Sequence, residues 1–262
     1  MAANALPLGW RLVVYGLSGI AAGIANGIAG GGTFLSFPTL LAMGIPTLTA
    51  NVSSTVGVLP STFGGIRGFR QELTTHRRLL RSLAPICLLG SLTGTAFLLL
   101  GSTQSFRSVV PWLIGIATAL FAMAPRITRR LASVERDLDD GTLVIRRKTL
   151  FIGVFLSSVY GGYFGAGLGI VLLAVMALTL PFEIYDLQGL RVALAMIINT
   201  VAAIVFIVRG HLAMEAVYML LIGTLIGGWW GTILIRRVSP KVVRALVIVV
   251  GAATTIKLAV GS

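Results

Sequence analysis

The sequence predicts an all-α, polytopic membrane protein with an inverted-topology repeat, in which each half is a broken or re-entrant helix pair followed by three transmembrane helices. Three observations lead to this fold class: the composition, two matched glycine-rich breaks and the placement of the basic residues. The chain of 262 residues is 56% hydrophobic and only 11% charged, with a mean hydropathy of +0.96. A soluble domain carries about 25% charged residues, so most of this chain is expected to lie in a lipid bilayer.

Apolar runs follow one another along the chain at about 10–28, 33–45, 47–66, 82–100, 108–124, 149–164, 168–180, 188–208, 213–235 and 243–260. A spanning helix needs about 20 residues, and most of these runs are long enough. Runs 33–45 and 168–180 are too short to cross comfortably. Each of the two is either a short, tilted helix or one arm of a re-entrant hairpin, and the sequence leaves both possibilities open.

Each short run directly follows a glycine-rich break. The first break, at 27–32, reads Gly-Ile-Ala-Gly-Gly-Gly, and the second, at 161–169, reads Gly-Gly-Tyr-Phe-Gly-Ala-Gly-Leu-Gly, about 135 residues later. Glycine inside a helix costs about 1 kcal/mol relative to alanine, so its repeated use here needs a reason. Interrupted apolar segments at corresponding positions of two halves are the sequence sign of a binding site in transporters.

The basic residues predict the topology. Three loops hold 16 of the 21 Lys and Arg residues: 67–81, 125–148 and 236–244. Two others, 101–107 and 209–212, hold one basic residue each. The positive-inside rule places the rich loops in the cytoplasm and the poor ones outside. Counting crossings from there makes 10–45 and 149–180 each enter and return on one side. The halves then have opposite orientations, and both termini are external.

These patterns divide the chain into a first transmembrane repeat at 1–125, a basic cytoplasmic linker at 126–148 and a second transmembrane repeat at 149–262. Identity between the halves is low, and Pro46 and Pro181 mark the same point after the two short runs. The repeat is therefore predicted from its pattern and its breaks.

A helix that begins after a break directs free N–H groups and a partial positive charge at the gap, which favours an anion. Glycine also lets a ligand approach the backbone closely. Two such breaks facing each other predict a site for a small anion. The other interpretation is that the glycines only allow close helix packing. With polar groups from the following runs, the predicted substrate-binding residues are Gly30, Gly31, Gly32, Thr33, Asn51, Ser53, Ser54, Gly165, Ala166, Gly167, Gln188, Arg191 and Asn199.

Arg191 is the most informative single residue of this set. It lies about one turn inside the cytoplasmic end of run 188–208. A charged residue within a membrane span indicates function by default. The alternative is an arginine whose head group reaches the lipid head groups.

Several classes of function are excluded by what the chain lacks. All eight acidic residues fall in loops or at helix ends, so no carboxylate lies deep in a span to relay protons or bind sodium. No metal-ligand cluster, nucleophile elbow or P-loop occurs, so we expect no enzyme, no catalytic residues, no cofactor and no metal. The net charge of +13 comes from loops between apolar runs, which argues against nucleic acid as a partner. The expected partners are the lipid bilayer and a small anion, and a homodimer stays open.

The motifs together resemble a known family. They are residues 27–38, 50–55 and 68–73 in the first half, and 161–167, 187–191 and Ile198-Asn199 in the second. Their order and spacing are similar to the TauE/SafE sulfite exporter family, also called the 4-toluene sulfonate uptake permease family. The resemblance implies a multi-pass protein of a prokaryotic cell inner membrane that moves sulfite, sulfonates or sulfoacetate, most often outward. The family often has Asn-Ala-Leu-Lys where this chain has Gln-Gly-Leu-Arg at 188–191, and 50–55 lacks one amide of the family pattern.

The leading hypothesis is a secondary transporter, working as an exporter, of small sulfur-containing anions. An inside-negative potential favours outward movement of an anion by about 2.3 kcal/mol per charge per 100 mV, which needs no buried carboxylate. The alternatives are an anion channel, which matched broken helices suit equally well, and a membrane scaffold without transport. The exact substrate, the coupling ion and the direction are not determined by the sequence.

Overall fold

The computed structural model describes residues 7–137, 147–209, 211–234 and 240–260, and in these ranges it is helical without strands. This confirms the all-α, polytopic fold class. The helices in chain order are α1 Leu8–Ala29, α2 Thr33–Ala42, α3 Thr47–Val58, α4 Ser61–Gly68, α5 Arg70–Thr75, α6 Arg77–Leu100, α7 Thr103–Asp137, α8 Arg147–Tyr163, α9 Leu168–Thr179, α10 Ile184–Arg209, α11 Met214–Leu234 and α12 Pro240–Val260.

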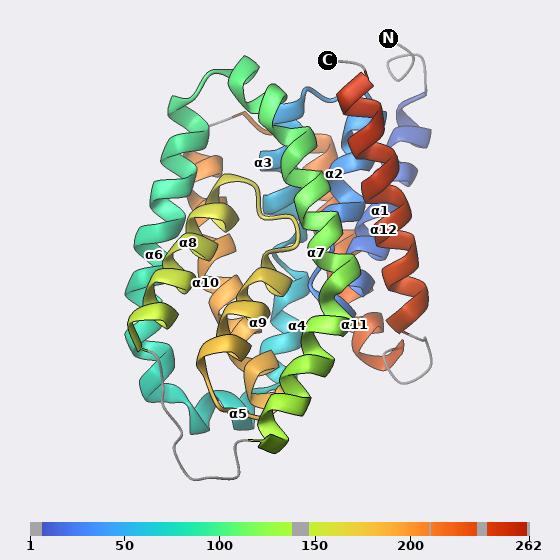
Figure 1. The fold of residues 1–262 in the computed structure, drawn as a ribbon. Coiled ribbons are helices and arrows are strands. Elements are labelled where there is room, and N and C mark those ends of the chain that lie inside the picture. The colour runs from blue at the N-terminus through green and yellow to red at the C-terminus, as the bar shows by residue number, and fades with distance from the viewer. Residues whose placement is uncertain (1–6, 138–146, 210, 235–239, 261–262) are drawn as a thin grey trace.

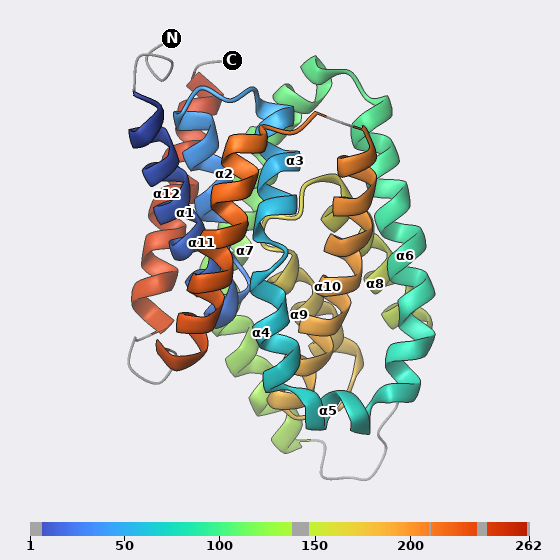
Figure 2. The ribbon, with the colours of Figure 1, turned by 180° about the vertical axis from the view of Figure 1, so that it is seen from behind.

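Helices α2 and α9, which follow the two breaks, are half-length. They have 10 and 12 residues, or about 15 and 18 Å at 1.5 Å per residue, against a hydrocarbon core of about 30 Å. Figures 1 and 2 show that the chain reverses its direction within the bundle between α1 and α2 and again between α8 and α9. Each short helix is therefore the returning arm of a hairpin.

The run that the sequence predicts as the next span is broken in the first half of the chain. Pro60 has no N–H to continue the helical ladder, so α3 ends before it and α4 begins after it. Side-chain hydroxyls bind carbonyls at the end of α3: Ser61 donates to Val58 at 2.6 Å, and Thr62 donates to Leu59 at 2.7 Å. The corresponding α10 is continuous. Among the helices that the structure describes, the first half thus has a further break that its counterpart α10 lacks.

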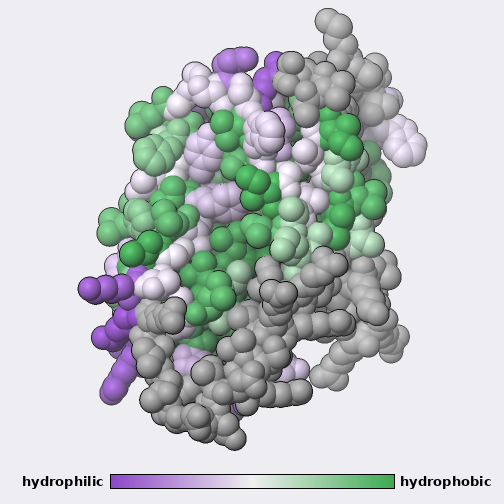
Figure 3. Space-filling model, viewed as in Figure 1, coloured by the Kyte–Doolittle hydropathy of each residue, from purple (hydrophilic) through white to green (hydrophobic). Residues whose placement is uncertain are grey.

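The outer surface is that of a membrane protein. Among the described residues, three helices are long and apolar enough to cross a bilayer, at Leu8–Gly27, Arg77–Leu100 and Ile184–Arg209. Large apolar side chains such as Trp112 and Leu100 are exposed. In Figure 3 hydrophobic side chains cover the middle of the visible face, and the most hydrophilic ones gather near its two ends.

The predicted linker at 126–148 is helical in its first part, since α7 continues to Asp137. Positions 138–146 lie outside the described residues. The start of α1 and the end of α12 lie at one end of the bundle, and α5 lies at the opposite end (Figure 1). This relative arrangement is the one that the charge count predicts. Which end faces the cytoplasm stays a prediction.

Two helix pairs form the most extensive packing, α1 with α11 and α6 with α8. In the first pair, a Cβ on Gly227 would lie 2.1 Å from the carbonyl oxygen of Ile20, and a Cβ on Gly23 would lie 2.6 Å from that of Thr224. The backbones therefore touch directly, as small residues allow in membranes.

Helices α6 and α8 also pack with their backbones in direct contact at glycine. A Cβ on Gly94 of α6 would lie 2.1 Å from the carbonyl oxygen of Val159, and one on Gly162 of α8 would lie 2.3 Å from that of Ser91. An exchange of the two halves would map α1 with α11 onto α8 with α6, so this packing agrees with the inverted repeat. The repeat itself stays a prediction.

Gly227→Ala is expected to destabilise the protein because its methyl group overlaps the backbone of α1. Overpacking of this kind costs about 1–3 kcal/mol. We expect a lower midpoint of thermal unfolding in detergent. The control is Gly16→Ala on the partner helix, where a Cβ meets no atom within 4 Å. Equal midpoints for both variants would contradict this close packing.

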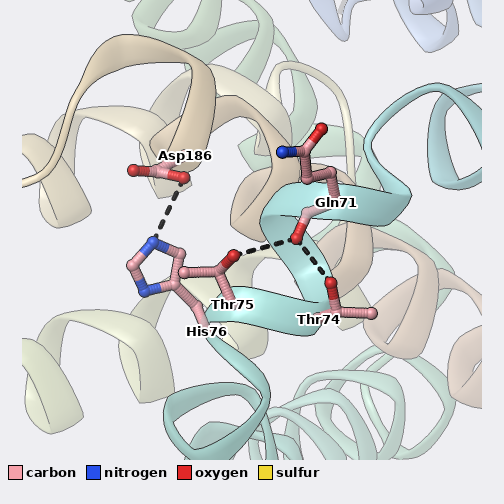
Figure 4. A network of polar contacts seen from close by, with 5 residues as sticks. All are labelled: Gln71, Thr74, Thr75, His76 and Asp186. Carbon is pink, nitrogen blue, oxygen red and sulfur yellow. Dashed lines mark hydrogen bonds and ion pairs between the residues drawn. The ribbon is translucent and has the colours of Figure 1, made fainter.

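At the end of the bundle that holds α5, a polar contact joins the two halves of the chain (Figure 4). Nε2 of His76 lies 3.1 Å from Oδ1 of Asp186, in the first turn of α10. The imidazole also stacks on Phe182 with ring centroids 4.2 Å apart. The start of α10 is thereby fixed against the start of α6, which positions the residues of the following turns of α10.

Candidate anion-binding site

The two breaks meet at Arg191. A Cβ on Gly30, at the end of α1, would lie 3.4 Å from Cα of Gly169 in α9 and only 2.2 Å from Nη1 of Arg191. A Cβ on Gly169 would lie 2.8 Å from the same nitrogen. Segments about 140 residues apart in sequence therefore converge on one guanidinium group. Only glycine leaves room for this group at both positions.

The backbone at the breaks adopts conformations that favour glycine. Gly30, Gly165 and Gly167 have φ of 73°, 77° and 75°, in the left-handed region that side chains with a Cβ rarely adopt. Helices α2 and α9 begin directly after these turns, so the N–H groups of their first turns lie close to the two breaks. Helices α1 and α8 end at the same places with their carbonyl groups.

Arg191 is buried without a partner. It is 6% exposed, and its Nε is a buried atom with no hydrogen bond. No hydrogen bond or ion pair of this side chain occurs within the described part of the chain. A snorkelling arginine would instead place its head group at the surface. A buried cation without a counter-charge is strongly unfavourable, so the arrangement favours occupation by an anion.

A cavity lies beside the guanidinium, between α1, α3, α4, α9 and α10. Its volume is about 60 Å³, which is enough space for about four to six water molecules. An anion of a few heavy atoms fits this volume. Besides Arg191, the polar side chains of the lining are those of Asn26, Thr33, Thr55, Ser61, Thr62 and Asn199.

The structure brings together five of the predicted residues at this cavity: Gly30, Thr33, Gly165, Arg191 and Asn199. The other residues of the breaks, which are Gly31, Gly32, Ala166 and Gly167, are buried beside it and are not part of its lining. Gln188 is half-buried on α10 and also lies outside the lining.

The three predicted polar residues of α3 make contacts that hold helices together. Nδ2 of Asn51 donates to the carbonyl of Tyr163 at 3.1 Å. Ser53 accepts a hydrogen bond from the N–H of Ala213 at 2.9 Å.

Ser54 completes this set, since its hydroxyl shares a hydrogen bond of 2.6 Å with that of Ser36 in α2. Asn51, Ser53 and Ser54 thus connect α3 to α8, to the start of α11 and to α2, and none of them lines the cavity.

Lining residues that the sequence reasoning did not select include Asn26, Thr55, Ser61, Thr62 and Gly169. Nδ2 of Asn26 donates to the hydroxyl of Ser61 at 2.7 Å, which joins the end of α1 to the start of α4. A sequence signal existed for three of them. Asn26 precedes Gly30 by four residues and so shares its helix face. Ser61 and Thr62 directly follow Pro60.

An aromatic layer supports the second break. The rings of Phe37 and Phe164 meet edge to face with centroids 5.5 Å apart, and those of Phe106 and Tyr163 do so at 5.6 Å. The hydroxyl of Tyr160 donates to the carbonyl of Ala166. The loop between α8 and α9 is therefore fixed by packing from α2 and α7 and by a hydrogen bond from α8, which holds the start of α9 against Gly30.

In the part of the chain that the structure describes, no group of three or more His, Cys, Asp or Glu side chains comes together where a metal ion could be held. Of the cavity-lining residues that the structure describes, only Arg191 is charged, so the arrangement has the chemistry of anion binding.

Comparisons with known proteins agree with the fold. Residues 15–258 match the family described as Sulfite exporter TauE/SafE. The chain is 21% identical over 243 residues to a probable membrane transporter protein of Haemophilus influenzae, covering 92% of this chain and 91% of the relative. It is 22% identical over 246 residues to the probable membrane transporter protein YfcA of Escherichia coli strain K12, covering 90% and 85%. Since the family match spans most of the chain, this protein belongs to the TauE/SafE sulfite exporter family.

Proposed function

We propose that this protein is a secondary transporter that exports small sulfur-containing anions, such as sulfite, sulfonates or sulfoacetate-like compounds, across the cell inner membrane. The observation that carries the proposal is the buried, unpaired guanidinium of Arg191 at the junction of two helix breaks. The family description and the names of the relatives, which are membrane transporter proteins, support the same function.

The site recognises an anion with groups of two kinds. The guanidinium offers planar, charge-assisted donors that match two oxygen atoms of an oxyanion at once. Amide and hydroxyl groups of Asn26, Asn199 and Thr33 reach the same cavity and can hold the remaining oxygens. Neither kind of group distinguishes sulfur from another central atom, so the sulfur preference rests on the family.

Transport needs the site to open to each side of the membrane in turn. The cavity lies between elements of both halves, with α1, α3 and α4 on one side and α9 and α10 on the other. In proteins with inverted repeats, a rocking movement of such halves exposes a central site alternately. We propose this movement here, with the basic loops in the cytoplasm and both termini outside.

The membrane potential supplies the driving force in this proposal. None of the described Asp and Glu residues lines the cavity, and Glu72, Asp186 and Glu215 lie in α5 or in the first turns of α10 and α11. The site therefore holds no carboxylate, among the residues described, for coupling to protons or sodium. An inside-negative potential moves an anion outward unaided.

Counterflow in proteoliposomes tests this function. We expect unlabelled sulfite trapped inside the vesicles to accelerate the entry of radiolabelled sulfite, because a carrier returns loaded faster than empty. Saturable flux with this acceleration supports the carrier. Unitary currents in a planar bilayer would show a channel instead, and the absence of any flux of sulfite or sulfonates would contradict transport.

A further inference from the structure

We propose that the site takes anions with a single negative charge and rejects dianions of the same shape. This inference rests on the proposed function of the same cavity and narrows its substrate class. It would make hydrogensulfite and simple sulfonates substrates. It would exclude sulfate, thiosulfate and the doubly charged form of sulfite, and from the substrates proposed above it would remove sulfoacetate, which carries a carboxylate besides its sulfonate.

The charge of the cavity is the first step. Of the described residues that line it, only Arg191 carries a charge. The other polar groups are neutral amides and hydroxyls, such as Asn26, Asn199 and Ser61. No carboxylate pairs with Arg191 in the described ranges, so the protein does not neutralise this charge itself. The empty site therefore carries one net positive charge.

The helix ends at the breaks do not add a second charge. A helix start carries about half a positive charge and a helix end about half a negative charge. At each break, the end of one helix meets the start of the next, α1 with α2 and α8 with α9. These partial charges offset one another to a first approximation, which leaves the guanidinium as the only net charge.

The free-energy cost of taking an anion out of water then distinguishes monoanions from dianions. The desolvation cost of an ion rises with the square of its charge, whereas its attraction to one fixed cation rises only in proportion to the charge. A monoanion leaves the occupied cavity neutral. A dianion leaves one uncompensated negative charge beside a cation that is 94% buried, given the 6% exposure of Arg191, at membrane depth where such a charge is expensive.

The neutral donors at the cavity can orient a bound anion but cannot balance its charge. Asn26 uses one N–H for Ser61, and the second N–H of its amide is a further donor at the cavity. Such groups orient the oxygen atoms of a bound anion without changing the net charge. They contribute shape and hydrogen bonding, while Arg191 alone sets the charge that the site accepts.

Methanesulfonate and sulfate test the inference directly. The two ions are nearly equal in shape and share an SO₃ face, but they carry one and two negative charges. We expect isothermal titration calorimetry of the full chain in detergent, at matched ionic strength, to give a dissociation constant for methanesulfonate at least about tenfold below that for sulfate. Sulfite binding is expected to weaken as pH rises and hydrogensulfite loses its proton, with methanesulfonate binding unchanged.

A charge variant provides a second readout in the same assay. Asn199→Lys places a second cation at the cavity and is expected to move the preference toward sulfate. If the unaltered protein bound sulfate as tightly as methanesulfonate, or more tightly, the preference for a single negative charge would be wrong. The cavity would then still be an anion site. Binding of neither ion would contradict the proposed function itself.

Discussion

Arg191→Gln is expected to weaken anion binding by at least about 100-fold, which corresponds to about 2.8 kcal/mol. Removing one partner of a buried, hydrogen-bonded charge pair costs about 2–5 kcal/mol. Glutamine keeps part of the side-chain volume and some hydrogen bonding but removes the charge that attracts the anion. Titration calorimetry with methanesulfonate measures the effect, and transport in proteoliposomes should be lost with it.

The same substitution is expected to leave the stability of the empty protein unchanged or to raise it. The guanidinium is buried with no counter-charge from the described residues, so its removal takes away an unfavourable burial. Arg191→Lys keeps the positive charge but loses the planar fork of donors. Its affinity for methanesulfonate should therefore lie between those of the unaltered protein and Arg191→Gln. This opposite effect on binding and on stability separates a functional arginine from a structural one.

Arg209→Gln is the matched control, since Arg209 belongs to the same helix and is exposed near its other end. We expect it to bind anions as the unaltered protein does. If Arg191→Gln bound methanesulfonate normally and unfolded at a lower temperature, Arg191 would be a structural residue and the proposed site would be wrong.

Gly30→Ala is expected to weaken anion binding by at least about tenfold. The new methyl group would lie 2.2 Å from Nη1 of Arg191, so the guanidinium has to leave its place between the two breaks. The residue also has φ of 73°, and this conformation costs an alanine about 1–2 kcal/mol. Both binding and thermal stability should therefore fall.

Gly44→Ala separates these two effects. Gly44 has a similar φ of 78° and is exposed between α2 and α3, away from the cavity. We expect both variants to lose a similar stability and only Gly30→Ala to lose anion binding. Equal, unaltered binding in both variants would show that the contact between Gly30 and Arg191 has no part in recognition.

The general position of the site could be predicted because glycine breaks and a charge inside a span are both costly in lipid. Gly30, Gly165 and Arg191 stand out for this reason alone, and they lie together in the structure. Their mutual contact could not be predicted, because it depends on how α10 packs against two hairpins. The left-handed turns at the breaks follow from the glycine pattern.

The roles of the other polar residues could not be read from the sequence. A hydroxyl or amide on an apolar helix serves packing as readily as binding. Asn51 and Ser54 face neighbouring helices, whereas Asn199, selected on the same grounds, faces the cavity. The difference is a rotation of the helix, which an apolar sequence with few polar positions does not define.

The break between α3 and α4 could not be predicted from its proline alone. Pro60 separates α3 from α4, yet Pro38 and Pro85 lie inside continuous helices. A proline therefore weakens a helix without deciding where it ends. The following hydroxyls of Ser61 and Thr62, which bind the carbonyls of Val58 and Leu59, are the additional signal at this place.

We expect the cavity between the two breaks to bind a small anion through Arg191. Diffraction from crystals soaked with bromomethanesulfonate, whose bromine scatters anomalously, locates that anion. An anomalous peak is expected in the cavity beside Gly30 and Arg191, and no peak is expected there in crystals of Arg191→Gln. A peak confined to exposed arginines such as Arg77 and Arg78, with the cavity empty, would show that Arg191 forms no anion site.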